Sequence, residues 1–456
     1  MRDLPVEILI KVFDHLPRSD KLQCAVVCKA WCTSALSILN STIHLKTASD
    51  TVILFEKLCQ LNSSIRGSTI RHLSVYHSSR ISEARVNKVV FIRILSECTH
   101  LRTLEFKDVT LDLTYLEHMI RYRNVLRLDH LQCIKTQYSN SSSYLLANWH
   151  YHQRINQLYL LILDSTFSQF EQANDLSMYL GHFKALKTLS LRLSCNIYIH
   201  SVLSACPQLE SLQLMFISAS QLRIYEDDKK SATRHSNIPF QLKYLDISGR
   251  QINQDLFEYL HDRAGALFQL TVNHNAYGNL EAIDSAFNTA LVVDTVLPIR
   301  RIILEDNFDI SHDVIIGLNE NFRNLRVIDF RRCNFNRVMD RNSNLSLNLI
   351  QLDLDYLSID FTTILFYNRQ VNSMSVAIQR NDYEGTTFYS RTSKWSAAHL
   401  FTRNDSSRYT NNAAQRIRVR SAKTSVITIK VRSLHQLHMH AEGNRKTFSQ
   451  IISLNY

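Results

Sequence analysis

The sequence predicts an α/β chain in which a short all-α segment precedes a curved parallel sheet with helices on its outer side. Three observations support this prediction. A short apolar phrase recurs from about residue 70, apolar helical stripes lie between successive phrases, and two further stripes occupy the first 31 residues. With 456 residues the chain is long enough to bury a large core.

The first 31 residues contain two amphipathic stripes. Apolar residues three and four positions apart form the first one: Leu4, Ile8, Leu9, Val12, Phe13 and Leu16. Pro5 suits a first helical turn, and Pro17 ends the helix. After Ser19, a candidate N-cap, the second stripe comprises Leu22, Val26, Val27, Ala30 and Trp31. Two short helices cannot bury both stripes alone, so one stripe must contact a partner or the rest of the chain.

This segment resembles the F-box, whose pattern is Leu-Pro-x-Glu-(Ile/Leu)-Leu, then Ile-Phe, Asp-Leu and Val-Cys-(Lys/Arg)-x-Trp. The sequence departs from the pattern at Val12, where isoleucine is usual, and at the inserted Lys21. The matching residues are Leu4, Pro5, Glu7, Ile8, Leu9, Phe13, Leu16, Asp20, Leu22, Val27, Cys28, Lys29 and Trp31. The alternative is an ordinary helical hairpin.

The resemblance implies docking onto the Skp-type adaptor of an SCF ubiquitin ligase and, through it, onto a cullin. On this interpretation the adaptor contacts are Leu4, Pro5, Ile8, Leu9, Val12, Phe13, Leu16, Leu22, Val26 and Trp31. The chain would then be a substrate receptor that presents a protein for ubiquitination and degradation.

The recurring phrase is an apolar residue, two variable residues, an apolar residue, one variable residue and an apolar residue. It appears at Leu101-Leu104-Phe106 and at Leu186-Leu189-Leu191, with a partial copy at Leu126 and Leu128. The starts run from residue 70 to residue 371 in eleven steps, a mean spacing of about 27 residues. Each phrase predicts a short strand, and stacking of strand–helix units would bury a continuous core.

The phrase and its spacing are typical of leucine-rich repeats. Cys98-Thr99-His100-Leu101 and Cys206-Pro207-Gln208-Leu209 resemble the helix-to-strand junction of F-box proteins with such repeats. The predicted fold is therefore an N-terminal all-α F-box followed by a leucine-rich-repeat solenoid. An α/β sheet without repeats is the alternative.

Four regions follow from these patterns: an F-box domain at 1–45, the solenoid at 46–376, a basic polar insertion at 377–425 and a terminal cap at 426–456. The insertion carries nine Lys and Arg against three acidic residues, so we expect a disordered segment or a lid. In the cap, the closely spaced runs 426–431 and 434–439 predict a hairpin around Arg432 and Ser433.

Composition limits the class of protein. The net charge of +11 comes largely from the 377–425 insertion, which makes nucleic acid an improbable partner. No apolar run approaches the roughly 18 residues that cross a bilayer, and the N-terminus lacks a secretory signal. Nine cysteines without a CxxC pair favour reduced thiols. We therefore expect an intracellular protein, in the cytoplasm or the nucleus, with no membrane partner.

The sequence contains no catalytic signature. GxGxxG, Walker, GxSxG and HExxH motifs are absent, so we expect no enzyme activity and no cofactor. Cys24, Cys28 and Cys32 have helical spacing, which favours helix packing over a metal site. The two-residue spacing typical of zinc-binding cysteine pairs is missing.

Function is then expected to rest on binding. The variable positions of the phrase would form a concave surface, and its middle is rich in arginine. We predict that a protein substrate presents an acidic or phosphorylated segment to Arg300, Arg301, Arg326 and Arg331. The alternatives are a solvated strand face of mixed charge, and a leucine-rich-repeat scaffold or nucleic-acid binder that acts outside a ligase.

Overall fold

The chain contains two compact units in the computed structural model. The first comprises residues 1–195 and 201–209, and the second comprises residues 196–200 and 210–456. The structure describes residues 4–60, 63–76, 87–107, 112–137, 139–163, 166, 175–217, 221–224, 239–273, 298–306, 308–340, 344–360, 373–380, 386–392, 402–404, 424–443 and 446–454.

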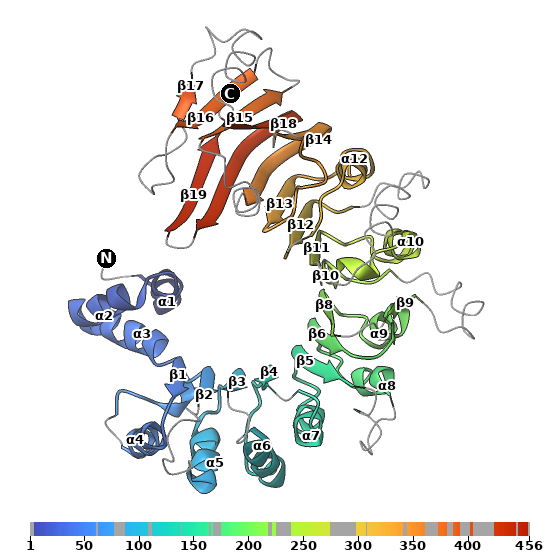
Figure 1. Cartoon of the computed structure of the whole chain (residues 1–456). Helices are drawn as coiled ribbons and strands as arrows, with labels where there is room; N and C mark the ends of the chain where they lie inside the picture. Colours follow the sequence, from blue (N-terminus) through green and yellow to red (C-terminus); the bar gives the residue numbers. More distant parts are fainter. Residues whose placement is uncertain are drawn as a thin grey trace. The chain divides into compact units, whose positions relative to one another are not determined.

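Three helices open the first unit: α1 (Val6–Asp14), α2 (Arg18–Val27) and α3 (Lys29–Leu39) (Figure 1). Pro5 and Pro17 are the N-cap residues of α1 and α2, as proline geometry favours. The second predicted stripe proves to be two helices, because Cys28 adopts an extended conformation and separates them. The Lys21 ammonium also donates to the carbonyl of Asp14, which ties α2 to the end of α1.

A parallel sheet follows these helices in the first unit. Its strands lie in chain order: β1 (Thr42–Leu45), β2 (His72–Val75), β3 (Thr103–Phe106) and β4 (Cys133–Lys135). A second parallel pair consists of β5 (Gln157–Ile162) and β6 (Thr188–Leu193). The amides of Asn156 and Gln157 donate to the Gln132 carbonyl and so connect β5 to β4. Strand β1 falls inside the predicted 1–45 domain but pairs with the sheet.

Helices lie on one side of these strands (Figure 1). They are α4 (Ala48–Cys59), α5 (Lys88–Glu97), α6 (Asp112–Arg121), α7 (Ser142–His150) and α8 (Leu176–Leu180), with a 3-10 turn η1 (Gly67–Thr69) before β2. Phe91 of α5 and Tyr115 of α6 pack on Phe106 of β3, each with a ring-centroid separation of 6.0 Å. The buried Tyr144 hydroxyl of α7 donates to the carbonyl of Tyr159, 2.8 Å away. The apolar phrase residues therefore face the helices.

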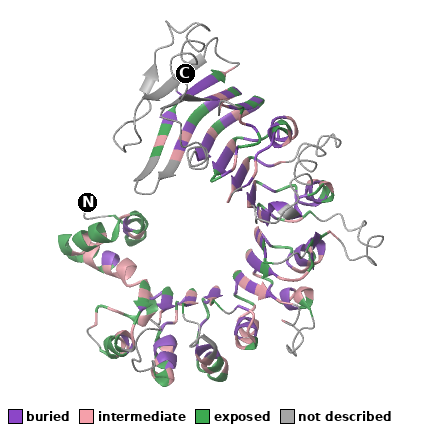
Figure 2. Cartoon of the chain, viewed as in Figure 1, coloured by how far each residue is buried: buried purple, intermediate pink, exposed green. Residues whose placement is uncertain are grey.

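Burial follows the predicted phrase along the strands (Figure 2). Leu73, Leu104, Leu158 and Leu189 are fully buried. The partial copy at 126–128 was wrong in register, because the strand lies at Cys133–Lys135 and the buried phrase residues are Leu131 and Ile134.

The second unit continues with parallel strands in chain order. They are β8 (Ser211–Phe216), β10 (Tyr244–Ser248), β11 (Gln269–Asn273), β12 (Arg301–Glu305), β13 (Val327–Arg331) and β14 (Leu345–Asp360). Helices α10 (Gln254–Arg263) and α12 (His312–Asn321) lie on one side (Figure 1). The remaining short elements of this unit are β7 (Ile197–Tyr198), which pairs with β9 (Leu222–Arg223), and η4 (Gly249–Gln251). Helix α9 (Ile199–Ala205) begins in this unit, and its residues from Ser201 on belong to the first.

The C-terminal part departs from the predicted pattern. Strand β18 (Thr424–Gly443) runs unbroken through Arg432 and Ser433, so the hairpin predicted there was wrong. The chain instead reverses after Gly443, and β19 (Lys446–Ser453) pairs antiparallel with β18. Strand β18 also lies between β14 and β15 (Ser373–Arg380). The 371–376 phrase is therefore not the next neighbour of β14.

Part of the predicted 377–425 insertion belongs to this sheet. Strands β16 (Thr386–Thr392) and β17 (Thr402–Asn404) continue antiparallel from β15. Residues 381–385, 393–401 and 405–423 of the segment predicted to be disordered or a lid lie outside the described residues. Among the described helices, none is long and apolar enough to cross a membrane.

Candidate functional site: N-terminal helices and two open sheet faces

The N-terminal helices have a small core of their own. Leu9 and Phe13 of α1 are 4% and 2% exposed and pack with Ala35 of α3. Trp31 contacts Phe13 edge to face at 5.3 Å between ring centroids, and Leu16 packs against the same cluster. Leu9, Phe13, Leu16 and Trp31 were predicted to contact the adaptor. Leu9 and Phe13 are instead buried in this core. Leu16 and Trp31 are only half-buried against it, so adaptor contact through these two residues stays a prediction.

The other predicted contacts remain at the surface. On α1, Ile8 and Val12 are one helical turn apart and both exposed, and Leu4 and Pro5 precede them at the surface. On α2, the exposed pair is Leu22 and Val26, and the latter is 79% exposed. Large apolar side chains left exposed at several positions of two helices are typical of a protein-binding surface. We call Leu4, Pro5, Ile8, Val12, Leu22 and Val26 the exposed stripe.

The four arginines predicted to bind substrate do not converge. Arg300 and Arg326 directly precede β12 and β13 and are neighbours, since the amide of Arg326 donates to the Arg300 carbonyl. Arg301 begins β12, whereas Arg331 ends β13, about 13 Å further along the strands at a rise of about 3.3 Å per residue. Two of the four guanidinium groups already have partners within the sheet. Arg326 donates to the Asp353 carbonyl, and Arg331 is ion-paired.

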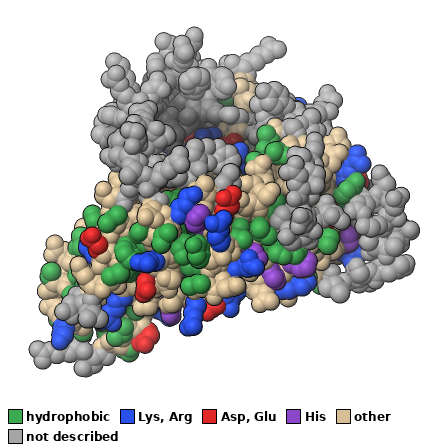
Figure 3. Space-filling view, turned by 90° about the horizontal axis from the view of Figure 1, so that it is seen from below, with side chains coloured by type: hydrophobic (Ala, Val, Ile, Leu, Met, Phe, Trp, Pro, Cys, Tyr) green, Lys and Arg blue, Asp and Glu red, His purple; other side chains and the backbone are tan. Residues whose placement is uncertain are grey.

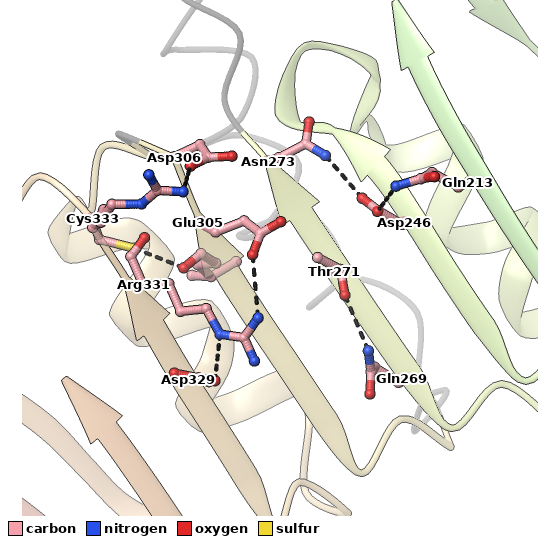
Figure 4. A network of polar contacts seen from close by, with 12 residues as sticks. Gln213, Asp246, Gln269, Thr271, Asn273, Glu305, Asp306, Asp329, Arg331 and Cys333 are labelled. Atoms are coloured by element: carbon pink, nitrogen blue, oxygen red, sulfur yellow. Dashed lines mark hydrogen bonds and ion pairs between the residues drawn. The ribbon is translucent and has the colours of Figure 1, made fainter. Parts of the chain in front are cut away.

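In the second unit, carboxylates dominate the side of strands β8 to β14 that faces away from α10 and α12. We call this side the second open face. Arg331 donates to Asp329 at 2.7 Å and lies 3.5 Å from Glu305, so its charge is offset locally (Figure 4). One residue beyond each strand, Asp306 and Arg332 form a further ion pair. Both have positive φ, of 57° and 52°, in a region that side chains other than glycine seldom adopt.

Asp246 of β10 is the centre of a hydrogen-bond cluster in the part of the second open face that is nearest β8. Its carboxylate accepts hydrogen bonds from Gln213 at 2.6 Å and from Asn273 at 2.9 Å, which come from the strands on either side (Figure 4). Burial raises the pKa of Asp246, although these two hydrogen bonds oppose the effect. Burial also raises the pKa of Glu305. These carboxylates therefore cross-link neighbouring strands, and their hydrogen-bonding capacity is largely used within the sheet.

The first unit presents a different surface on the strand side that faces away from its helices, which we call the first open face. Lys107 lies over the ring of Tyr76 at 4.7 Å and donates to its hydroxyl at 2.8 Å. The Tyr76 ring also contacts His44 edge to face. Glu105 is the acidic residue in β1–β6, and its carboxylate accepts from Ser74 and pairs with Lys107. Cationic and aromatic side chains thus dominate this face.

Lys135 of β4 extends this arrangement. Its ammonium lies 5.0 Å from the centre of the Tyr159 ring on β5. Glu105 is its register partner on β3, yet the carboxylate is directed to Ser74 and Lys107. At the strand entries, Arg71 and Arg102 are both exposed. Sequence reasoning missed Lys135 because the phrase had been placed at residues 126–128.

His72 of β2 reports the electrostatic potential of the first open face. Burial lowers its pKa, and the nearby positive charges of Arg102, Arg71 and Lys135 lower it further. The helical side of this unit shows no comparable separation of cationic from acidic side chains. Seen from below, from the side where α5 and α6 lie in Figure 1, cationic, acidic, histidine and hydrophobic side chains are mixed (Figure 3).

Metal chemistry finds no support in the described ranges. No group of three or more His, Cys, Asp or Glu residues there could hold an ion. Cys24, Cys28 and Cys32 are free thiols, and Cys24 packs against the N-terminal core. Burial raises the pKa of Cys98, Cys133 and Cys206 to about 12, so these thiols remain protonated.

Comparison with known proteins bears on the N-terminal helices. Residues 1–45 match the family described as F-box-like. No curated protein matches the chain. Domains of this family generally bind Skp-type adaptors. The first 45 residues, with their buried Leu9 and Phe13 and their exposed stripe, are therefore an F-box-like domain.

Proposed function

We propose that this chain is the substrate-recognition subunit of an SCF-type ubiquitin ligase. The F-box-like domain docks onto a Skp-type adaptor and through it onto a cullin, and the strand–helix units, which we interpret as leucine-rich repeats, hold a protein substrate. Ubiquitin transfer takes place on other subunits. The chain itself contributes local concentration and orientation and needs no cofactor. We place this activity in the cytoplasm or the nucleus.

One observation carries the proposal: the exposed stripe on helices that match the F-box-like family. Val12, Leu22 and Val26 leave large apolar surfaces in water, although the same helices bury Leu9 and Phe13. Covering a large apolar side chain is worth roughly 1.5–3 kcal/mol. Contact with an apolar groove of the adaptor would remove this surface from water.

Co-purification of the full chain with a recombinant Skp-type adaptor tests the proposal. Val12→Glu combined with Val26→Glu should abolish adaptor capture, because two charges would be forced into an apolar interface. The matched control is Val89→Glu with Val125→Glu, at exposed valines elsewhere in the first unit. Leu9→Ala is unsuitable here because it opens the core.

Circular dichroism should show that both double variants remain folded. Loss of the adaptor in the stripe variant alone, together with loss of cullin from cell extracts, supports the proposal. Equal capture by all three proteins would refute docking through the stripe. Capture of adaptor without cullin would indicate a scaffold outside a ligase.

A further inference from the structure

We propose that the first open face binds an extended, Asp- and Glu-rich segment of a partner protein. The cations that would contact it lie on, directly before or directly after strands β2, β3, β4 and β6. They are Arg71, Arg102, Lys107, Lys135 and Arg192. The identification of the partner as a captured substrate rests on the proposed function. The binding of an acidic segment to this face does not depend on it.

The charges of this face are available to a ligand. Among the described residues, Lys135 has no ion-pair partner, because the adjacent carboxylate of Glu105 is occupied by Ser74 and Lys107. Its contact with Tyr159 orients the ammonium without neutralising it. Arg102 and Arg192 are exposed. At Lys135, Arg102 and Arg192 an anionic segment would therefore gain ion pairs without first breaking internal ones, whereas Lys107 is already paired with Glu105.

The lowered pKa of His72 supports this electrostatic description independently of ion-pair geometry. Three of the charges that lower it, those of Arg102, Arg71 and Lys135, come from the face itself. They act on one imidazole, so their fields overlap at the strand surface. Asp14 of α1 opposes them.

The spread of the cations favours many carboxylates over one phosphate. A single phosphate is usually held by guanidinium groups gathered at one point. Here the cations are distributed over several strands, and neighbouring strands are about 4.8 Å apart. Acidic side chains on one side of an extended peptide repeat every two residues, about 6.6 Å, and can meet such a row in succession.

The tyrosines of this face are poorly suited to nucleic acid. Single-stranded nucleic acids stack their bases on open aromatic rings. The ring of Tyr76 is covered by Lys107 and flanked by His44, and the ring of Tyr159 is covered by Lys135. A peptide that contacts the ammonium groups needs no free ring face.

Fluorescence anisotropy of the full chain with a labelled, glutamate-rich peptide of about ten residues tests the inference. The test variant is Arg102→Gln with Lys135→Gln. The control is Arg300→Gln with Lys430→Gln, which removes two exposed cations from the second unit. We expect affinity about tenfold weaker for the test variant, roughly 1.4 kcal/mol, and less than about twofold change for the control.

Equal weakening in both variants, or none in either, overturns the inference. Tighter binding of a singly phosphorylated peptide or of a single-stranded oligonucleotide with the same total charge overturns the choice of ligand. Adaptor capture is measured on the same preparations. A chain that captures adaptor but not peptide refutes this inference alone, whereas one that binds peptide but not adaptor refutes the proposed function alone.

Discussion

The two open faces share a backbone design but use charge in opposite ways. On the second open face, Asp329 is buried and Asp246 is half-buried, and both accept hydrogen bonds from neighbouring side chains. On the first, Lys135 and Arg102 project from the strands without a carboxylate partner among the described residues. Charge that is satisfied internally stabilises a sheet, whereas charge left exposed is available to a partner.

The largest expected effect compares one carboxylate from each face. Asp246→Ala should lower the free energy of unfolding by about 2 kcal/mol, because the amides of Gln213 and Asn273 lose their acceptor in a half-buried position. Glu105→Ala should cost less than about 1 kcal/mol, since its ion pair with Lys107 is partly exposed to water. Urea denaturation followed by circular dichroism measures both. Equal losses would erase the distinction between the faces.

A smaller effect concerns the pH dependence of stability. The folded-state pKa of Asp246 is raised by burial above the ordinary value of 3.8. The folded chain therefore binds more protons than the unfolded chain in the window that starts near 3.8, and this contribution to stability is lost as pH rises through the raised pKa. Asp246→Asn should remove that decline. Parallel pH profiles for the wild type and the variant, measured by urea denaturation from about pH 4 to 6, would contradict the assignment.

The smallest effect sharpens the description of the first open face. Lys135→Met should raise the pKa of His72 toward its ordinary value of 6.5, because one of the positive charges that lower it is removed. Nuclear magnetic resonance titration of the His72 ring measures this directly. Arg301→Met, in the second unit, is the control and should leave the His72 pKa unchanged. A His72 pKa that Lys135→Met leaves unchanged would show that the Lys135 charge does not act on this imidazole.

Periodicity predicted the strands well where all three positions of the phrase are apolar. Leu104 and Leu189 are buried in the expected register. It failed at β4, because Thr136 ends the phrase that begins at Leu131, and the nearby Leu126 and Leu128 offered a false match. It failed again at β18, where alternation shifts between Val431 and Leu434 without a turn. Period-two patterns do not distinguish a turn from an irregularity within one strand.

The candidate sites show a similar division. The family resemblance located the helices but not which apolar residues face inward, because packing against α3 selects Leu9 and Phe13 for the core. For a related reason the sequence did not reveal that Arg331, one of the four predicted arginines, is ion-paired within the sheet. Arg331 and Glu305 are 26 positions apart in sequence, and only the pairing of β12 with β13 makes them neighbours. Whether a charged residue of a sheet is free to bind a partner therefore depends on the side chains of the neighbouring strands.

The central claim, that the first open face and not the second receives acidic segments, is tested most directly by zero-length cross-linking. A carbodiimide joins a peptide carboxylate to a lysine only when the two are in contact. With an acetylated, lysine-free, glutamate-rich peptide and the full chain, mass spectrometry should find the peptide on Lys107 and Lys135. Equal labelling of Lys430, which is exposed on β18, or labelling of Lys430 alone, would contradict the account.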